Sequence, residues 1–344
     1  DNVVLNDAVH EGDFTQDSYI LHHQPKSILC APLLNQGKLQ GVLYLENNLT
    51  TGAFTPDRIQ VLSLLSAQAT ISIENASLYG RQVELTESYS RFVPMEYLRF
   101  LQKERIMDVH LGDHVSKEMA VMFSDIRSFT ALSEKMTAQE NFDFVNSYLR
   151  RVSPQIRDNN GFIVKYLGDG MMAVFPNGAD DALKAGIGKL RKVEQYNLER
   201  QKEGRQPIKV GVGIHVGHMM VGMVGEVARM QGDAFSDNVN LTSRLESLTK
   251  FYAVSLVISE ETLSNLEDPN RYQIRFLDRV IVIGRTEPIS IYEVLDGETD
   301  TVRNLKLETQ AHFEKGIRHY QTKQWADAKF HFNEVLEVHP TDQT

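Results

Sequence analysis

The segment Met119-Ala-Val-Met-Phe-Ser-Asp-Ile126 decides the fold of the larger part of this chain. Its apolar run has the length and composition of a buried strand, and Asp125 places a carboxylate at the end of that strand. A second acid, Asp169, stands in Tyr166-Leu-Gly-Asp-Gly170, between two further apolar segments. The pattern predicts a sheet with acidic side chains at the ends of two strands.

Around these segments, strands and helices alternate from residue 118 to about residue 295, as expected of an α/β or α+β domain. The predicted strands span 119–126, 162–167, 171–175, 208–215, 219–224, 256–258, 274–283 and 289–294. The predicted helices span 138–157, 180–202 and 239–250. After Asn304 the chain is again helical, with apolar spacing like that of one tetratricopeptide repeat. One such repeat cannot bury its own apolar face, so we expect it to pack on the rest of the chain or on a partner protein.

The first part of the chain reads as a hairpin of two strands, 27–34 and 39–45, followed by a long helix. Apolar residues recur in that helix every seven positions, at Leu64, Ile71, Leu78, Leu85 and Phe92. The complementary heptad position is occupied by Gln68, Asn75, Gln82 and Tyr89. This seam favours a coiled coil of two helices, although packing of one helix on its own domain gives a similar stripe. Pro94 should end or kink the helix.

Length and composition limit the possible functions. With about 150 residues per domain, the 344 residues suggest roughly two domains with connecting elements. The net charge of −10 gives no overall attraction to nucleic acid or anionic lipid. No apolar run approaches the roughly 20 residues that a membrane-spanning helix needs. A single cysteine, Cys30, and the lack of a signal-peptide pattern predict a cytoplasmic protein. Because the chain starts at Asp1, we expect it to be part of a longer protein.

Two acids at neighbouring strand ends repel each other unless a divalent cation neutralises them, and Mg²⁺ prefers carboxylate oxygens. Asp125 and Asp169 are therefore candidate metal ligands, although Asp-Gly is also a common hairpin turn. Lys165 lies on the strand before Asp169, where simple alternation puts it on one face with Ile163 and Leu167. An ammonium in that position needs an acceptor.

A third polar cluster is a predicted loop that starts at Gly232 and runs into a helix. Asn240 and Arg244 share one face of this helix and could present an amide and a guanidinium to one phosphate. A solvated surface pair is the alternative. His215 and His218 lack a third ligand nearby and are interpreted as structural.

Taken in order, these blocks resemble the class III nucleotidyl cyclase catalytic domain. The resemblance runs from about residue 115 to 295 through four segments, Phe123–Thr130, Lys165–Gly170, Gly213–Gly217 and Asp233–Arg244. The preceding stretch, from Arg91-Phe-Val-Pro94 to Val109-His-Leu-Gly-Asp113, resembles the transducer element of such cyclases. The start of the chain resembles the C-terminal half of a GAF domain, through Gly41-Val-Leu-Tyr-Leu-Glu46, Gly52-Ala-Phe-Thr55 and Ile73–Tyr79.

The resemblance implies an α+β fold, with a ferredoxin-like βαββαβ catalytic domain, a partial GAF domain, a coiled-coil linker helix and a C-terminal helical hairpin. The expected boundaries are 1–58 for the partial GAF domain, 59–93 for the signalling helix, 94–116 for the transducer element, 117–297 for the catalytic domain and 305–344 for the tetratricopeptide-like hairpin.

The resemblance also implies an adenylate cyclase that forms a homodimer with shared active sites. Asp125, Asp169 and the Ile126 carbonyl of one protomer would hold two divalent cations, Mg²⁺ or Mn²⁺. Lys165 and Asp233 of the other protomer would read adenine, because an ammonium donates to N1 and a carboxylate accepts from the N6 amino group. The remaining implied substrate contacts are Asn240 at the ribose, Arg244 at the α-phosphate, Phe129 and Thr130 at the outer phosphates, and Arg285 at the triphosphate.

The sequence departs from the family pattern at a few positions. Gly211 stands where some members have an arginine, Ile283 replaces a usual lysine, and Phe235-Ser236 replaces Ile-Gly. Guanylate or diguanylate cyclase activity is an alternative enzymatic function. Lys165 and Asp233 argue against both activities. The absence of a Gly-Gly-Asp-Glu-Phe sequence also argues against diguanylate cyclase activity. A catalytically silent signalling scaffold is the non-enzymatic alternative.

Overall fold

The computed structural model describes residues 2–90, 92–93, 95–282 and 287–344. The chain divides into two compact units, Asp1–Phe92 and Val93–Thr344, each of which is described by itself. Both units mix helices with sheet, and the second is built as the predicted α+β fold. No helix in the described part of the chain is long and apolar enough to cross a membrane.

Unit 1 is a three-stranded antiparallel sheet in the order β1-β2-β3, followed by a long helix. Its elements are β1 (Val3–Leu5), α1 (Ser18–His23), β2 (Ser27–Asn35), β3 (Lys38–Asn47) and α2 (Pro56–Ser90). The predicted hairpin is confirmed, because β2 pairs with β3 from Ser27↔Asn47 to Asn35↔Lys38.

The apolar stripe of α2 is uncovered within the single chain. Leu64 is 69% exposed, and Ile71, Leu78 and Leu85 are each at least half exposed. The pairing of two such helices stays a prediction, and Pro94, expected to end or kink the helix, lies outside the described residues.

Unit 2 is organised around one eight-stranded sheet. Its strands are β4 (His114–Ile126), β5 (Phe162–Leu167), β6 (Gly170–Phe175), β7 (Val210–Glu226), β8 (Arg229–Phe235), β9 (Leu256–Ser259), β10 (Ile274–Val280) and β11 (Ile289–Val294). The order is β10-β11-β9-β7-β4-β6-β5, with β8 paired to β7. Strands β4, β5, β6 and β7, with a helical segment after β4 and another after β6, form the predicted ferredoxin-like βαββαβ core.

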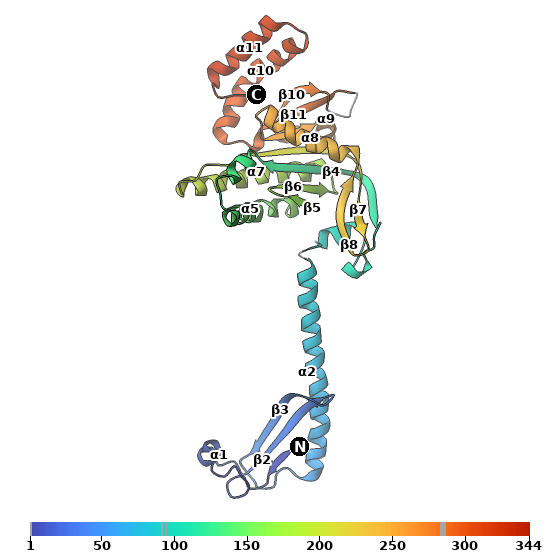
Figure 1. The fold of residues 1–344 in the computed structure, drawn as a ribbon, viewed down its shortest axis with the longest axis vertical. Helices are drawn as coiled ribbons and strands as arrows, with labels where there is room; N and C mark the ends of the chain where they lie inside the picture. The colour runs from blue at the N-terminus through green and yellow to red at the C-terminus, as the bar shows by residue number, and fades with distance from the viewer. Residues whose placement is uncertain (1, 91, 94, 283–286) are drawn as a thin grey trace. The chain divides into compact units, whose positions relative to one another are not determined.

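Helices cover both faces of this sheet (Figure 1). They are α3 (Met95–Phe100), α4 (Phe129–Ser133), α5 (Ala138–Val152), α6 (Pro154–Arg157), α7 (Ala179–Lys202), α8 (Asp237–Phe251), α9 (Glu260–Ser264), α10 (Asp300–Gln321) and α11 (Trp325–Val338), with single 3₁₀ turns at Ile106–Asp108, Pro269–Arg271 and Leu295–Gly297. The apolar faces of α5 and α7 form one core with the sheet, and α8 packs on the opposite face.

The structure corrects three predicted elements. The strands expected at 208–215 and 219–224 are one continuous strand, β7, because it pairs with β4 along its length from His114↔Gly222 to Ile126↔Val210. The polar loop expected from Gly232 begins inside strand β8, which pairs with β7 in an antiparallel ladder. The helix expected at 138–157 is divided into α5 and α6 at Pro154, which cannot donate to the helical ladder.

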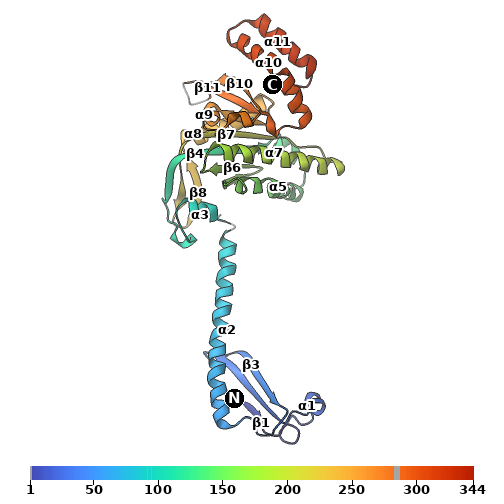
Figure 2. The ribbon, with the colours of Figure 1, turned by 180° about the vertical axis from the view of Figure 1, so that it is seen from behind.

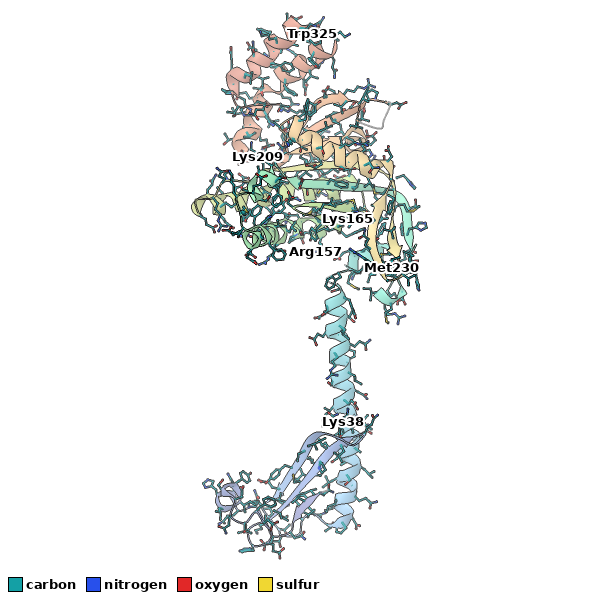
Figure 3. The ribbon with its side chains drawn as sticks, in the orientation of Figure 1. Lys38, Arg157, Lys165, Lys209, Met230 and Trp325 are labelled. Carbon is teal, nitrogen blue, oxygen red and sulfur yellow. The ribbon has the colours of Figure 1, made fainter. Side chains whose placement is uncertain are left out.

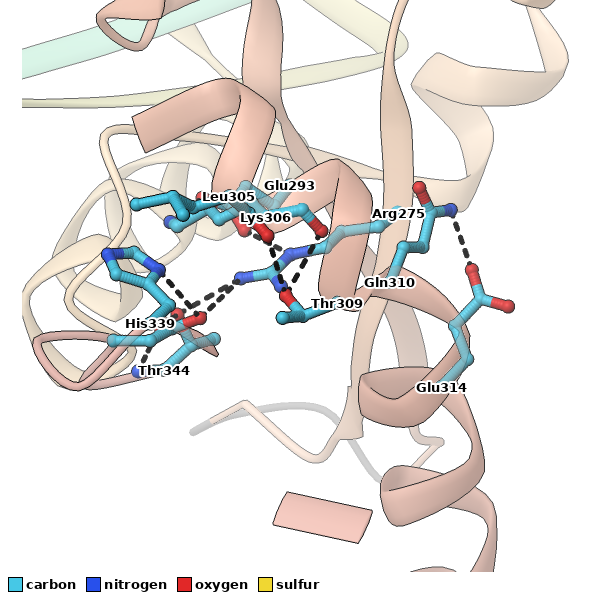
Figure 4. A network of polar contacts seen from close by, with 10 residues as sticks. Arg275, Glu293, Leu305, Lys306, Thr309, Gln310, Glu314, His339 and Thr344 are labelled. Carbon is cyan, nitrogen blue, oxygen red and sulfur yellow. Dashed lines mark hydrogen bonds and ion pairs between the residues drawn. The ribbon is translucent and has the colours of Figure 1, made fainter. Parts of the chain in front are cut away.

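The C-terminal hairpin of α10 and α11 is confirmed as helical and is anchored to the sheet by buried charges (Figure 4). Glu293 on β11 accepts hydrogen bonds from Arg275 Nε and from Lys306 Nζ, each at 2.6 Å. The Arg275 guanidinium also lies 4.1 Å from the centre of the Phe313 ring on α10. The hairpin is therefore part of the second unit, while its tetratricopeptide likeness stays a prediction.

Candidate active site

Two carboxylates converge at the end of β4. Asp125 is the next-to-last residue of β4, and Asp169 lies in the tight turn between β5 and β6. Because β4 pairs with β6 through Ser124↔Met171, the two acids become neighbours. Asp169 Oδ2 accepts a hydrogen bond from the Ile126 backbone N–H at 3.2 Å, and a Cβ on Gly170 would lie 3.0 Å from Asp125 Oδ1.

The pKa of Asp169 reports the crowding of negative charge at this point. Burial raises that pKa to about 7, and the Asp125 carboxyl adds to the rise through a hydrogen bond and through its charge. In the described residues, no group of three or more His, Cys, Asp or Glu side chains could hold a metal ion. A cation here would have the two carboxylates, a backbone carbonyl and oxygens of a bound ligand as its donors, which is the mixed donor set that suits Mg²⁺.

The segment after β4 turns sharply and begins a short helix. Ser128 has a φ of 55°, in the left-handed region, and α4 starts at Phe129. The Phe129 ring stacks on Phe144 of α5, with ring centres 6.2 Å apart, so this side chain packs in the core. The Thr130 side chain is exposed. Both predicted phosphate contacts, Phe129 and Thr130, lie in the first turn of α4, which follows Asp125 closely along the chain.

Lys165 and Asp233 form an ion pair, with Nζ and Oδ2 2.7 Å apart (Lys165 is labelled in Figure 3). The Lys165 side chain is 35% exposed and the Asp233 side chain 15% exposed. Asp233 Oδ1 also accepts a hydrogen bond from the Ala234 backbone N–H at 2.8 Å. The acceptor that Lys165 was expected to need is therefore a carboxylate on a different strand.

The face on which Lys165 lies was predicted wrongly. A bulge between Ile163 and Lys165 inserts one residue into β5, so Ile163 pairs with Ala173 whereas Lys165 pairs with Met172. Met172 also pairs with Phe123 of β4, two residues before Asp125. The bulge thus puts Lys165 on the sheet face of Asp125 and opposite to Ile163.

Asn240 and Arg244 lie one turn apart on α8, where Asn240 is exposed and Arg244 half-buried. Ser236 caps the helix, because its side-chain oxygen accepts from the Asn238 backbone N–H at 2.9 Å. Within the described part of the chain, neither side chain hydrogen-bonds to the carboxylate pair or to the Lys165 and Asp233 pair. The structure therefore pairs Asp125 with Asp169 and Lys165 with Asp233, whereas Asn240 and Arg244 make no direct hydrogen bond to either pair among the described residues.

A column of glycines on β7 positions α8. Gly211, Gly213 and Gly217 alternate along the strand and face the helix. A Cβ on Gly213 would lie 2.9 Å from the Glu246 Cα, and one on Gly217 would lie 2.6 Å from the Asn238 Cγ. Larger residues would push α8 away from the sheet, so the glycines set the depth at which the helix carries its polar residues.

The departures noted in the sequence have structural counterparts. Gly211, where some relatives of this pattern have arginine, pairs with Asp125 and lies under the Glu246 carboxylate. His215 is buried and contacts Ser259 Oγ at 2.7 Å and Asn238 Oδ1 at 3.1 Å, which agrees with a structural role. Arg285 and Ile283 lie outside the described residues.

The sequence alone did not reveal two ionisable residues near the carboxylate pair, Lys189 and Glu246. Lys189 of α7 is fully buried and hydrogen-bonds to Ser124 Oγ, and burial lowers its pKa to about 7. Burial raises the pKa of Glu246 to about 7, and the charge of Asp125 adds to this effect. A lysine inside the apolar stripe of the predicted helix 180–202, between Gly186 and Val193, was the available signal.

Each of the two units matches a known protein family. Residues 113–295 match the model of the adenylate and guanylate cyclase catalytic domain, and residues 1–73 match that of the GAF domain. A terminal-differentiation specific adenylate cyclase of Dictyostelium discoideum is 35% identical over 269 residues, which are 76% of this chain and 13% of that protein. An adenylate cyclase of Anabaena cylindrica is 37% identical over 222 residues, which are 63% of this chain and 44% of that protein.

A solved structure shares the fold. The structure of a bacterial light-regulated adenylyl cyclase aligns with a TM-score of 0.55 and 21% identity, over 80% of this chain and 81% of that one. The chain spans less than half the length of the two curated relatives that it matches.

Proposed function

This chain belongs to the adenylate and guanylate cyclase family, and on that premise we propose that it converts ATP into 3′,5′-cyclic AMP and pyrophosphate. The 3′ oxygen of the ribose would attack the α-phosphorus, and the bond from that phosphorus to pyrophosphate would break. Both named relatives are adenylate cyclases, which supports ATP as the substrate.

The observation that carries the choice of ATP is the pair formed by Lys165 and Asp233. The two side chains lie 2.7 Å apart and present one cationic donor beside one anionic acceptor. Adenine offers the complementary edge, with an acceptor at N1 and a donor at the N6 amino group, whereas guanine offers an O6 acceptor and an N1 donor. Lys165 has three donors and a carboxylate has several acceptor positions, so the pair can bind a base while it stays in contact.

Asp125 and Asp169 fit a site for two divalent cations, Mg²⁺ or Mn²⁺, together with the Ile126 carbonyl. Their convergence supports this assignment, and burial together with the neighbouring Asp125 carboxyl raises the pKa of Asp169 to about 7. When bound, such cations lower the pKa of the ribose 3′-hydroxyl and neutralise charge on the triphosphate. The role of the protein would be to hold Asp125, at the end of β4, beside Asp169 in the turn between β5 and β6.

The remaining site residues would act on the ribose and the phosphates. Asn240 would orient the ribose, and Arg244 would stabilise the charge that develops at the α-phosphate. The backbone of Phe129 and Thr130 would receive the outer phosphates, with Arg285 as a further cation. Because Arg244 acts on charge that grows in the transition state, its loss should lower turnover more than substrate affinity.

We further propose a homodimer in which each active site uses residues of both protomers. One observation supports it: the stripe from Leu64 to Leu85 on α2 is exposed. A second α2 would cover that stripe as a coiled coil. A signal at the GAF domain would then shift the paired helices and change the alignment of the half-sites.

The domain boundaries 1–58, 59–93, 94–116, 117–297 and 305–344 stay our assignment. A cytoplasmic location and a partner protein at the C-terminal helices likewise stay predictions.

The first experiment is to incubate the purified chain with ATP or GTP, in Mg²⁺ or in Mn²⁺, and to quantify the cyclic nucleotides. We expect cyclic AMP from ATP, and loss of that product in Asp125→Ala. The matched control is Asp300→Ala, which removes an aspartate whose side chain is 85% exposed on α10.

Each alternative has its own result in this experiment. Cyclic GMP as the main product would overturn the assignment of Lys165 and Asp233 to adenine. No cyclic nucleotide from either substrate, combined with normal ATP binding, would favour the signalling scaffold.

The coiled coil is tested by a disulfide between protomers at Leu78→Cys, in a Cys30→Ser background. We expect oxidation to crosslink the chain as a dimer and to change its activity reversibly. The same pair placed at Glu84, another exposed position of α2 outside the apolar stripe, is the control. Efficient crosslinking at Leu78 without any change in activity would contradict regulation through this helix.

A further inference from the structure

Tyr97, in the short helix α3, contacts three strands of the second unit at once. Its side chain is buried, and the hydroxyl donates a hydrogen bond to the Gly222 carbonyl of β7 at 2.8 Å. Its ring meets the Phe162 ring of β5 edge-on, with centres 5.3 Å apart. A Cβ on Gly232 of β8 would lie 2.8 Å from the Tyr97 Cζ, so the phenol lies flat against the backbone there.

These contacts lie beside the two residues assigned to adenine. Phe162 begins the strand that carries Lys165, and Gly232 directly precedes Asp233. Gly222, which accepts the hydroxyl hydrogen bond, is the ladder partner of Asp233. Figure 2 shows α3 beside the ribbon of β7 and β8.

The sheet itself does not set the spacing of this pair. β5 pairs with β6, whereas β8 pairs with β7, and β4 and β6 separate β7 from β5 in the sheet order. No ladder of backbone hydrogen bonds therefore joins β5 to β8, and their separation depends on side-chain packing. Tyr97 supplies such packing, and Phe100 adds a second ring 5.2 Å from Phe162.

We propose that Tyr97 is a positioning residue for base recognition. It holds β5 against the antiparallel pair of β7 and β8, and so fixes Lys165 relative to Asp233. The inference rests on the proposed adenylate cyclase function. Reading a base with two groups requires both at a fixed separation, and groups held by packed neighbours keep that separation better than free side chains. Tyr97 is buried behind the pair and would act only through it.

The test uses Tyr97→Phe, which removes the hydroxyl and keeps the ring, in the full chain. Loss of one hydrogen bond that positions a binding group should raise KM for ATP about threefold to tenfold, with kcat changed less than twofold. The preference for ATP over GTP should fall by a similar factor. Tyr196→Phe, at a buried tyrosine of α7 that lies against Arg151, is the matched control and should change neither value.

A double-mutant cycle separates positioning from a general loss of structure. If Tyr97 acts through the base-reading pair, Tyr97→Phe should have no further effect on KM in a Lys165→Met background. Additive effects in that cycle would overturn the inference. So would an unchanged KM and base preference in Tyr97→Phe, or a fall in kcat and melting temperature alone.

Failure of the inference differs from failure of the proposed function. A wild-type chain that makes no cyclic AMP would overturn the function and this inference together. A wild-type chain that makes cyclic AMP, with a Tyr97→Phe variant indistinguishable from it, would overturn the inference alone. If Tyr97→Phe does not fold, Phe100→Leu loosens the same packing on Phe162 and should also raise KM for ATP.

Discussion

Two groups of charged side chains in the second unit are built on opposite principles. In the C-terminal cluster, Glu293 has both oxygens bound by cations, from Arg275 and Lys306, and all three residues are buried (Figure 4). At the end of β4, the carboxylates of Asp125 and Asp169 lie side by side. There Lys165, the cation of the neighbouring pair, keeps 35% of its side chain exposed.

The difference separates charge that holds the fold together from charge that is available to a ligand. A buried carboxylate with matched cations has no capacity left, and removing one partner leaves uncompensated charge in a medium of low dielectric constant. Two carboxylates side by side make a site of negative potential that a divalent cation relieves. Ionisable groups left partly unmatched at a surface are thus the better indication of function.

The largest effect should come from breaking the carboxylate pair. Asp169→Asn should lower cyclic AMP formation about a thousandfold or more, equivalent to roughly 4 kcal/mol, because a metal ligand is lost. The variant should unfold at the same temperature as the wild-type chain or a higher one, since one of two repelling acids is gone. Activity assays and thermal unfolding in metal-free buffer check both parts. A clearly lower melting temperature would contradict the view that this pair is strained by its own charge.

Breaking the C-terminal cluster should give the reverse result. Glu293→Gln leaves the buried Arg275 and Lys306 without their carboxylate and should lower the free energy of unfolding by about 3–5 kcal/mol. Activity per folded molecule should stay near the wild-type value at low temperature. Urea unfolding measures the effect, with Asp300→Asn as a control that should cost less than about 0.5 kcal/mol. A loss as small as that control would mean that the cluster does not anchor the hairpin.

The base-reading pair should fall between these extremes. Lys165→Met removes a charged hydrogen-bond donor to the base and should lower kcat/KM for ATP about 10- to 100-fold. Asp233 keeps the Ala234 backbone N–H as a donor, so the free energy of unfolding should fall by only about 1–2 kcal/mol. Lys117→Met, at an exposed lysine of β4, is the matched control. A stability loss as large as that of Glu293→Gln would place this pair with the structural cluster instead.

The smallest effect concerns Glu246, the half-buried glutamate of α8 whose pKa depends in part on Asp125. Its pKa is raised to about 7, first by burial and then by Asp125. The folded protein therefore keeps this proton up to about pH 7, whereas the unfolded chain releases it near the ordinary glutamate pKa of 4.5. Between these values the unfolded state binds fewer protons, so the free energy of unfolding falls as the pH rises.

Glu246→Gln should remove that contribution. Relative to the variant, the wild-type chain should lose about 1–2 kcal/mol between pH 5 and pH 8, a figure reduced for the partial exposure of the group. Urea unfolding at both pH values gives the comparison. Parallel pH profiles for the two proteins would show that Glu246 titrates normally.

The sequence predicted elements that are decided locally. Apolar runs located β5 and β6 to within one residue, but they found only the second part of β4, which starts at His114 and not at Met119. The spacing of Asp125, Asp169 and Lys165 marked these residues as unusual. Strand β8 was missed because Arg229–Phe235 has little apolar character of its own, and its ladder with β7 makes it a strand. The bulge before Lys165 is likewise a property of the pairing, which no pattern within β5 reveals.

Charge partners were harder to predict than charged sites. Arg275, Glu293 and Lys306 look like ordinary surface residues in the sequence, because their burial depends on helix α10 packing over two strands. Tyr97 gave no signal either, since its contacts lie far along the chain, at Phe162, Gly222 and Gly232. The sequence contains these residues, but only the tertiary fold brings them together.

The glycine column under α8 also has a consequence for how such a protein can evolve. Every amino-acid replacement of a glycine adds a Cβ, and at Gly213 that atom would collide with the backbone of α8. We therefore expect these glycine positions to tolerate no neutral substitutions, whereas the exposed positions of α8 can be substituted. The glycines keep the spacing between strand β7 and helix α8 constant. Substitutions on the outer face of α8 can change specificity without altering that spacing.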